Sequence, residues 1–334
     1  MPSERNTDVQ ELADAVRRGS PRAVARLISL AEDAAAVPGR GGVLRHVMAA
    51  LAVGASGPSR ARVIGLTGAP GVGKSTTTNM LIAGLRGRGH RVGVLAVDPS
   101  SPFTGGALLG DRVRMRDHGT DPDVFIRSMS SRGRLGGLAW AAPQALRVLA
   151  AAGYDVILLE TVGVGQIEVD IARLADTTVV LLAPGMGDDV QTAKAGILEI
   201  ADVFVVNKAD HDGAQATIRE LRRMTSLAKG PWRPPTVPTV ATRGDGADDL
   251  LTALDDHAAH LEKSGEDHRR RLTRAREEIE NAALAQLRSR FTDLHGDRLD
   301  ALARQLLTGE VDLYTAADDI IATILRIRPE INRF

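Results

Sequence analysis

The sequence of 334 residues contains no cysteine. Disulfides and thiolate metal sites are therefore excluded, and the composition fits a cytoplasmic protein. Aromatic residues make up only 3% of the chain, which leaves few rings to stack on nucleic-acid bases. The 42 basic residues balance the 42 acidic ones, so there is no excess of positive charge for a phosphate backbone. We expect no nucleic-acid partner.

Long hydrophobic runs are also lacking. The longest apolar stretches have the length of strands, and residues 1–5 contain no apolar signal core. We therefore expect no membrane span. The length leaves room for one large domain with additional segments.

Short apolar runs recur through the middle of the chain, and each is followed by a loop and a helical pattern. We predict strands at residues 62–67, 91–97, 124–128, 155–160, 177–183, 202–206 and 236–241. Nearly continuous apolar runs are typical of a parallel sheet that helices cover on both faces. The predicted fold class is α/β, with three layers around a mainly parallel sheet.

Helical patterns flank this region on both sides. We predict an N-terminal helical extension over residues 1–60, an α/β domain over 61–263 and a C-terminal helical arm over 264–334. Charge is dense at helical spacing in residues 266–289, and residues 312–327 are amphipathic. These C-terminal helices are either solvated or form a dimerisation arm.

A glycine-rich loop follows the first predicted strand. Residues 68–75, Gly-Ala-Pro-Gly-Val-Gly-Lys-Ser, contain every fixed position of the G-x-x-x-x-G-K-S pattern, so the fold is predicted to be that of a P-loop NTPase. The glycines allow backbone N–H groups to point at a phosphate, and a helix starting at Lys74 adds its dipole. We expect Lys74 to bind the β- and γ-phosphates and the Ser75 hydroxyl to bind Mg²⁺. The predicted phosphate-binding residues are Gly68, Ala69, Pro70, Gly71, Val72, Gly73, Lys74, Ser75 and Thr76.

A second motif, Asn-Lys-Ala-Asp at residues 207–210, follows the sixth predicted strand, and open α/β sheets bind ligands at such strand ends. The Asp210 carboxylate can accept from guanine N1–H and from the exocyclic amine, and adenine lacks that arrangement of donors. Sites of this kind can reach roughly 10⁴-fold selectivity. We expect Asn207 to brace the loop, the Lys208 stem to cover the base and Ala241 to offer its backbone N–H to guanine O6. The two motifs together predict GTP and GDP as ligands.

Acidic residues near the phosphate loop are candidate Mg²⁺ ligands. Asp98 ends the second predicted strand before a proline, and Asp111 follows a glycine-rich segment. Mg²⁺ prefers oxygen ligands and keeps several waters, so carboxylates near the γ-phosphate suit it. Alternatively, Asp98 starts an Asp-Pro turn and Asp111 caps a helix. The predicted metal ligands are Ser75, Asp98, Asp111 and Glu160.

The fourth predicted strand ends in a switch motif, Glu-Thr-Val-Gly, from Glu160 to Gly163. Ordinary G proteins have Asp-x-x-Gly here, so this carboxylate is one methylene longer. We expect Glu160 to act on Mg²⁺ through water and the Gly163 N–H to contact the γ-phosphate. No glutamine directly follows Gly163, although Gln166 lies nearby, so we expect slow hydrolysis that a partner or dimerisation accelerates.

Lysine is rare, because the chain uses arginine for most of its positive charge. The lysines are Lys74, Lys194, Lys208, Lys229 and Lys263. Two of them stand in the nucleotide motifs, where a compact ammonium suits phosphate. Lys194 ends a glycine-rich loop, residues 184–194, that also carries Asp188, Asp189 and Gln191. The loop can form charge pairs; alternatively it is an acidic helix N-terminus.

Together these residues resemble the MeaB/ArgK family of SIMIBI-class GTPases, which are chaperones of cobalamin-dependent acyl-CoA mutases. The resemblance covers essentially the whole chain, and the switch motif that begins at Glu160 is its most specific element. The matching segments are residues 68–76, 97–101, 105–115, 124–127, 160–166, 187–191 and 207–210, with a further likeness around 18–28.

The resemblance implies a homodimer with the C-terminal helices in its contact. It implies that the partner is a mutase such as methylmalonyl-CoA mutase, and that GTP hydrolysis gates adenosylcobalamin loading and helps to expel damaged cofactor. Residues 188–194 correspond to the third switch of the family, where Lys194 stabilises transition-state charge. The predicted catalytic residues are Lys74, Glu160, Gly163 and Lys194.

Three other GTPase or phosphotransfer classes compete with this interpretation. A nickel-insertion GTPase needs Cys and His clusters, whereas the eight histidines here are scattered. Of these, His257 and His260 have a metal-ligand spacing, but we expect them on a solvated helix face. A protein kinase needs a base that activates an acceptor, and none is evident. A signal-recognition GTPase needs a Met-rich domain, and the chain has seven methionines.

Overall fold

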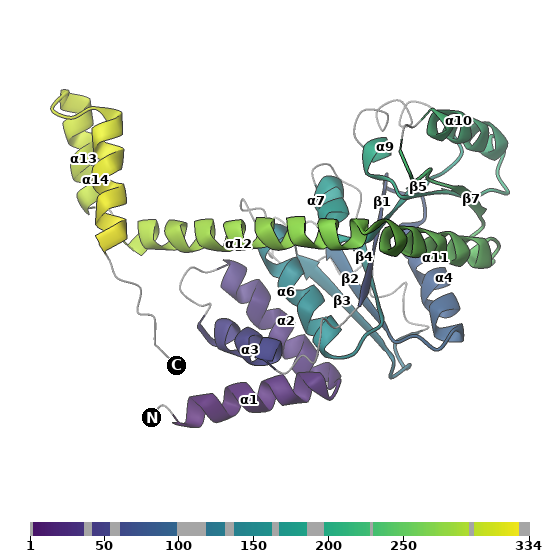
Figure 1. Cartoon of the computed structure of the whole chain (residues 1–334), viewed down its shortest axis with the longest axis horizontal. Coiled ribbons are helices and arrows are strands. Elements are labelled where there is room, and N and C mark those ends of the chain that lie inside the picture. The colour runs from purple at the N-terminus through teal and green to yellow at the C-terminus, as the bar shows by residue number, and fades with distance from the viewer. Residues whose placement is uncertain are drawn as a thin grey trace. The chain divides into compact units, whose positions relative to one another are not determined.

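The computed structural model describes residues 3–36, 42–53, 61–98, 118–130, 137–161, 167–185, 197–227, 230–293 and 297–326. Within these residues, seven strands form one sheet in the order β3-β2-β4-β1-β5-β6-β7, and every neighbouring pair is parallel (Figure 1). The strands are β1 (Arg62–Gly68), β2 (Val92–Asp98), β3 (Val124–Ser130), β4 (Val156–Thr161), β5 (Thr177–Leu182), β6 (Val203–Asn207) and β7 (Thr236–Thr239). The predicted three-layer α/β fold is confirmed.

Two helices, α4 (Lys74–Gly87) and α11 (Ala247–Ser264), cover one face of the sheet (Figure 1). Side chains alternate along each strand, so Ile64 and Leu66 of β1 are buried on this face together with Leu158 of β4. The carboxyl ends of β1, β4 and β6 lie at the same edge of the sheet. That edge brings the phosphate loop, Glu160 and Asn207 together.

The other face carries the N-terminal helices and the helices between the central strands. These are α1 (Ser3–Arg17), α2 (Pro21–Ala36), α3 (Gly42–Val53), α6 (Gly137–Ala151) and α7 (Ile167–Leu174). Leu27 and Ile28 of α2 share one buried cluster with Ile157 of β4. On the edge strand β3, Arg127 donates to the Glu32 carboxylate at 2.6 Å and to the Ala25 carbonyl at 3.0 Å. Helix α2 is thus packed against α6 and anchored to the edge strand β3, and α1 and α3 pack against α2.

Helices α9 (Ile197–Ile200) and α10 (Ala214–Ser226) cover the β5–β6 side of the sheet through a third buried cluster. Its members include Phe204 of β6 and Leu221 of α10. In the chain, α9 lies between β5 and β6 and α10 lies between β6 and β7. The carboxyl ends of these strands lie at the same edge of the sheet as the phosphate loop.

A buried polar cluster joins α11 and the start of α12 (Glu266–Asp293) to the amino ends of the strands. His257 is fully buried, with its Nε2 at 3.2 Å from Asp202 and its ring 4.9 Å from the Trp232 ring. Arg270 donates to both oxygens of Asp202, at 3.1 and 3.2 Å. The expectation that His257 lies on a solvated face is therefore wrong, because packing by Trp232 and pairing with Asp202 bury it.

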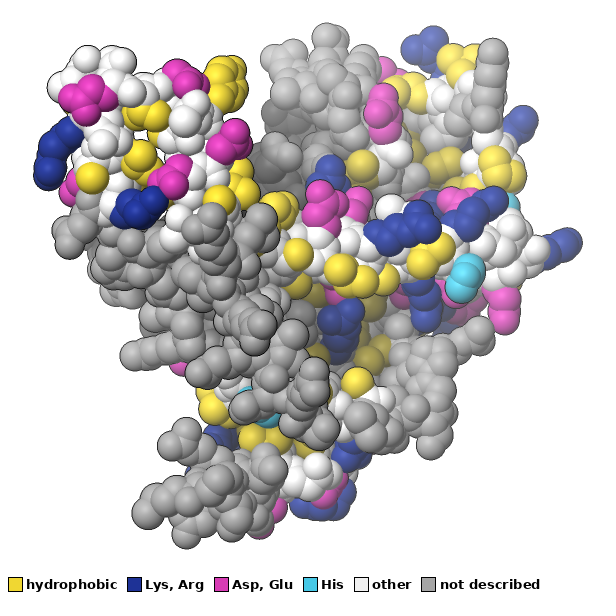
Figure 2. Space-filling model, turned by 60° about the vertical axis from the view of Figure 1, so that its left-hand side comes forward, with side chains coloured by type: hydrophobic (Ala, Val, Ile, Leu, Met, Phe, Trp, Pro, Cys, Tyr) yellow, Lys and Arg dark blue, Asp and Glu magenta, His cyan; other side chains and the backbone are white. Residues whose placement is uncertain are grey.

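The chain divides into two compact units, Met1–Ala275 and Arg276–Phe334. The second unit contains α13 (Asp297–Thr308) and α14 (Leu313–Arg326), which an Arg298–Asp319 ion pair at 2.7 Å links. Large hydrophobic side chains are exposed on this unit, as Figure 2 shows for part of it: Ile279, Leu284, Leu287, Leu299, Leu306, Leu307, Leu313, Tyr314 and Ile321. In the described part of the chain, no helix is both long and apolar enough to span a membrane.

Candidate functional site

The phosphate loop connects β1 to α4, and α4 begins at Lys74, the residue at which the sequence predicts its start. Gly71 and Gly73 have φ values of 80° and 97°, in the left-handed region that glycine adopts without strain. Gly73 caps the helix without a side-chain hydrogen bond. The first N–H groups of α4 are therefore not used by a capping side chain and can face an anion.

The Lys74 side chain folds back into the loop. Its Nζ donates to the carbonyls of Gly68 and Ala69, at 2.7 and 2.9 Å, and the side chain is 7% exposed. A buried ammonium held by two loop carbonyls is fixed as a point charge within the phosphate loop, as phosphate binding needs.

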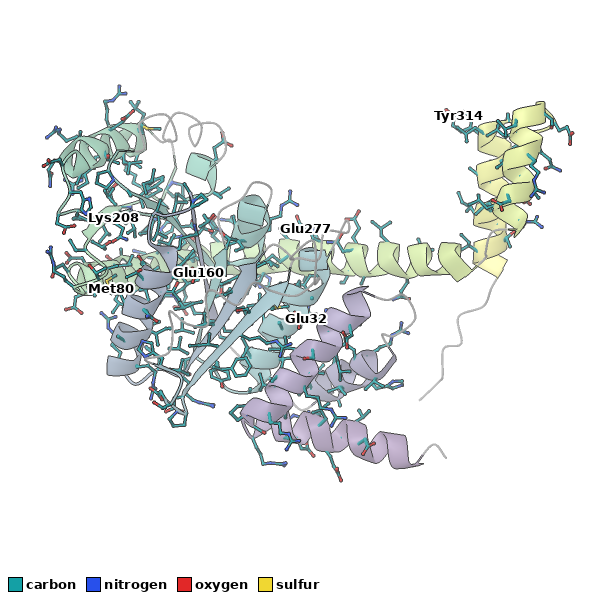
Figure 3. All side chains as sticks on the ribbon, turned by 180° about the vertical axis from the view of Figure 1, so that it is seen from behind. Glu32, Met80, Glu160, Lys208, Glu277 and Tyr314 are labelled. Carbon is teal, nitrogen blue, oxygen red and sulfur yellow. The ribbon has the colours of Figure 1, made fainter. Side chains whose placement is uncertain are left out.

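Glu160, labelled in Figure 3, lies at the end of β4 next to the first turns of α4. Its side chain is 4% exposed, and its Oε1 accepts from the Ser75 hydroxyl at 2.6 Å. Its Oε2 accepts from the Thr78 hydroxyl at 2.8 Å. A buried carboxylate beside a hydroxyl at a phosphate-binding helix supplies the hard oxygen donors that Mg²⁺ prefers, so these residues fit the ion.

The remaining predicted site residues are described in part or not at all. Asp98 ends β2, and the pairing of Ala96 with Glu160 places the end of β2 beside the end of β4. The structure does not describe the Asp98 side chain. Asp111, Gly163 and Lys194 lie outside the described residues, together with the rest of residues 162–166 and 186–196.

Asn207 holds three segments of the site together. Its Nδ2 donates to the Val72 carbonyl in the phosphate loop at 2.8 Å, and the residue is 4% exposed. Its Oδ1 accepts from the Thr239 hydroxyl and from the Ala241 N–H, both at 3.1 Å. We expected the Ala241 N–H to face a base; in this structure it donates to Asn207, because a buried N–H needs an acceptor. Sequence reasoning missed Thr239, which has no motif of its own.

Lys208 and Asp210 follow on the same turn. Among the described residues other than glycine, only Lys208 has a positive φ, at 56°. Its Nζ donates to the Gly71 carbonyl at 2.9 Å, so its side chain (labelled in Figure 3) reaches the phosphate loop. Asp210 lies 3.5 Å from the Arg243 guanidinium, a partner that no sequence pattern predicts. An open pocket of about 590 Å³ is lined by Pro184, Asp210, His211 and Asp212.

Residues 24–295 match the family model described as methylmalonyl-CoA mutase-associated GTPase MeaB. The chain belongs to this family. A Pyrococcus abyssi protein named as a GTPase is 45% identical over 323 residues, which cover 95% of this chain and 97% of that protein. The mouse protein named methylmalonic aciduria type A homolog, mitochondrial, is 35% identical over 267 residues, covering 76% of this chain and 63% of that one.

A solved structure shares the fold of this MeaB-family chain over nearly its whole length. The crystal structure of a LAO/AO transport system kinase superposes with a TM-score of 0.67 at 25% identity, covering 96% of this chain and 98% of the other. Fold, motifs and relatives agree on a P-loop GTPase of the MeaB family that binds GTP and GDP.

Proposed function

We propose that this MeaB-family GTPase is a chaperone of a cobalamin-dependent acyl-CoA mutase, either methylmalonyl-CoA mutase or a relative. In this proposal, GTP binding and hydrolysis gate the loading of adenosylcobalamin and protect the mutase. The description of the family and the name of the mouse relative support the mutase as partner. The nickel-insertion and protein-kinase alternatives have no comparable support among the described residues.

The proposed binding of GTP rests on the hydrogen bond from Asn207 to the phosphate loop. Because one side chain bonds to Val72 and to Ala241, the segment that recognises the base and the segment that binds phosphate move as one unit. GTP spans both segments. The fixed geometry lets a correct base position the phosphates for reaction.

In hydrolysis, Lys74 would neutralise charge on the β- and γ-phosphates, and Ser75, with Glu160 acting through water, would hold Mg²⁺. The ion, when bound, stabilises the charge that develops on the phosphate oxygens. Asp98 and Asp111 are proposed as further carboxylates near the ion. Gly163 is proposed to contact the γ-phosphate, and Lys194 to stabilise transition-state charge.

We propose that hydrolysis is slow in the isolated protein. The sequence lacks a glutamine directly after Gly163, and such a residue positions the attacking water in many G proteins. A mutase that orders the switch segments would accelerate the reaction. The protein is also proposed to be cytoplasmic and to act as a homodimer. The exposed hydrophobic side chains of the C-terminal unit support the dimer.

The test is GTP turnover by the purified protein with and without a cobalamin-dependent acyl-CoA mutase. We expect slow turnover alone and an increase of at least about tenfold with methylmalonyl-CoA mutase. Lys74→Ala is the control, because it removes the phosphate-binding charge and should abolish turnover in both conditions. Turnover that no cobalamin mutase changes would contradict the mutase partnership but leave the GTPase assignment in place.

A further inference from the structure

The carboxylate at the switch motif is held by two hydroxyls from one helix. Ser75 and Thr78 are three residues apart on α4, a spacing that places their side chains on the same face. The Ser75 hydroxyl lies 2.6 Å from Oε1 of Glu160, and the Thr78 hydroxyl lies 2.8 Å from Oε2. Each oxygen of the carboxylate thus has its own donor.

Thr78 is fully buried in the second turn of α4. Its hydroxyl lies 3.1 Å from the Lys74 carbonyl as well as 2.8 Å from Glu160. A hydroxyl has one proton, and a charged acceptor at the shorter distance takes it. The bond to Glu160 is therefore the one that orients the Thr78 side chain.

The two hydroxyls differ in what they do when the metal is present. Ser75 is the expected Mg²⁺ ligand, so its hydroxyl must be oriented toward the ion as well as toward the carboxylate. Thr78 has no such second task. Glu160 also has one methylene more than aspartate, and therefore one more rotatable bond to fix.

We propose that Thr78 is a positioning residue that anchors one oxygen of Glu160 and so adapts the longer carboxylate to the Mg²⁺ site. This inference rests on the proposed Mg²⁺-dependent GTP chemistry. Groups that orient metal-binding side chains typically contribute about 10- to 100-fold to metal affinity. Loss of the Thr78 hydroxyl is expected to weaken Mg²⁺ binding and leave nucleotide binding without Mg²⁺ unchanged.

The first experiment measures release of a fluorescent GDP analogue as Mg²⁺ is titrated, using Thr78→Val to remove the hydroxyl at nearly constant shape. We expect the Mg²⁺ concentration for half-maximal slowing of release to rise by about 10- to 100-fold. Affinity for the analogue in EDTA should change by less than about twofold, and Thr78→Ser should restore the wild-type Mg²⁺ requirement.

Thr77→Val is the matched control. Thr77 is the neighbouring residue on α4 and is equally buried, but in the described part of the chain its hydroxyl has no hydrogen-bond partner. Its replacement should leave the Mg²⁺ requirement within about twofold of wild type. Equal effects of Thr77→Val and Thr78→Val would overturn the proposal, and so would a Thr78→Val effect that persists in EDTA.

A double-mutant cycle tests whether the length of Glu160 matters. The shorter side chain of Glu160→Asp cannot reach both hydroxyls, so Thr78→Val added to it should raise the Mg²⁺ requirement by less than about twofold further. If the increases in Mg²⁺ requirement caused by Thr78→Val and Glu160→Asp multiply in the double variant, the two residues act independently and the inference is overturned. If the wild-type protein binds no GDP, the proposed function itself fails; a wild-type Mg²⁺ response that Thr78→Val leaves unchanged defeats only this inference.

Discussion

The side-chain amide of Asn207 donates to the backbone oxygen of Val72 at 2.8 Å, and this bond joins the end of β6 to the phosphate loop after β1. The two residues are far apart in the chain, and β5 lies between their strands in the sheet. The contact turns two separate sequence motifs into one binding site.

Replacement of Asn207 by alanine should cost both stability and nucleotide affinity. The change leaves the Val72 carbonyl and the Ala241 N–H without their partner, and each buried unpaired group costs about 1–3 kcal/mol. We expect unfolding free energy to fall by more than about 2 kcal/mol and GDP affinity by more than about tenfold. Thr239→Val removes one bond and should cost about 1 kcal/mol. Denaturant titration measures the unfolding free energy, and fluorescent-GDP binding measures the affinity. Equal losses for Asn207→Ala and Thr239→Val would argue against Asn207 as the residue that connects the two motifs.

Two glycines of the loop should respond differently to the same substitution. Gly71→Ala and Gly73→Ala both place alanine at a positive φ, which costs about 1–2 kcal/mol. Only at Gly73 would the new Cβ lie 2.3 Å from the Asn207 amide nitrogen, whereas at Gly71 it meets nothing within 4 Å. Gly73→Ala should therefore be less stable than Gly71→Ala by about 1–3 kcal/mol. Thermal unfolding without nucleotide measures the difference, and similar melting temperatures would mean that Asn207 does not constrain the loop.

The buried Asp202 should make stability depend on acid pH. Burial raises the pKa of Asp202, but hydrogen bonds and charge from His257 and Arg270 outweigh it and hold the pKa below its ordinary value. A carboxyl with a lowered folded-state pKa stabilises the protein above its unfolded pKa of about 3.9 and loses that contribution as pH falls through the folded value. Wild-type unfolding free energy should therefore decline between about pH 5 and about pH 3.

The Asp202→Asn variant should show a shallower decline over the same range, because its side chain binds no proton. Asp256→Asn, a change at an exposed aspartate of α11, is the control and should keep the wild-type slope. Denaturant unfolding at several pH values gives the slopes. Identical slopes for Asp202→Asn and wild type would show that Asp202 is not a source of the acid sensitivity.

The ion pair between Asp210 and Arg243 should contribute little to affinity. Its charged atoms are 3.5 Å apart, and the two side chains are 36% and 55% exposed. Exposed pairs of this kind are worth about 0–1 kcal/mol, which corresponds to at most about a fivefold change in a binding constant. Arg243→Gln should thus change GTP affinity by no more than about fivefold, measured by calorimetry. A larger loss would mean that Arg243 itself contacts the nucleotide.

The strands could be predicted from the sequence because the sheet is parallel and covered on both faces. Such strands are continuous apolar runs, and each predicted strand overlaps an observed one with ends that differ by at most two residues. The phosphate loop and the Asn207 motif could also be predicted from the sequence, because each is a short run of consecutive residues. The described structure places both at one edge of the sheet.

Contacts that depend on packing between distant segments could not be predicted. Arg243 pairs with Asp210 and Thr78 pairs with Glu160, and neither Arg243 nor Thr78 belongs to a motif described above. His257 was expected on a solvated helix face, yet Trp232 and Asp202 bury it. The Ala241 N–H donates to Asn207 because the buried Asn207 amide needs hydrogen-bond partners. The spacing of the two residues in the sequence does not reveal this contact.

The most direct test of the central claim is the base preference of Asp210→Asn. The wild-type carboxylate accepts from the guanine N1–H and amine, whereas an asparagine amide offers a donor that matches the O2 of xanthine. Dissociation constants for GTP and xanthosine triphosphate, measured side by side, should show at least about a 100-fold preference for GTP in the wild type and a preference for xanthosine triphosphate in the variant. Equal binding of GTP by both proteins would contradict the account, because Asp210 would then not recognise the base.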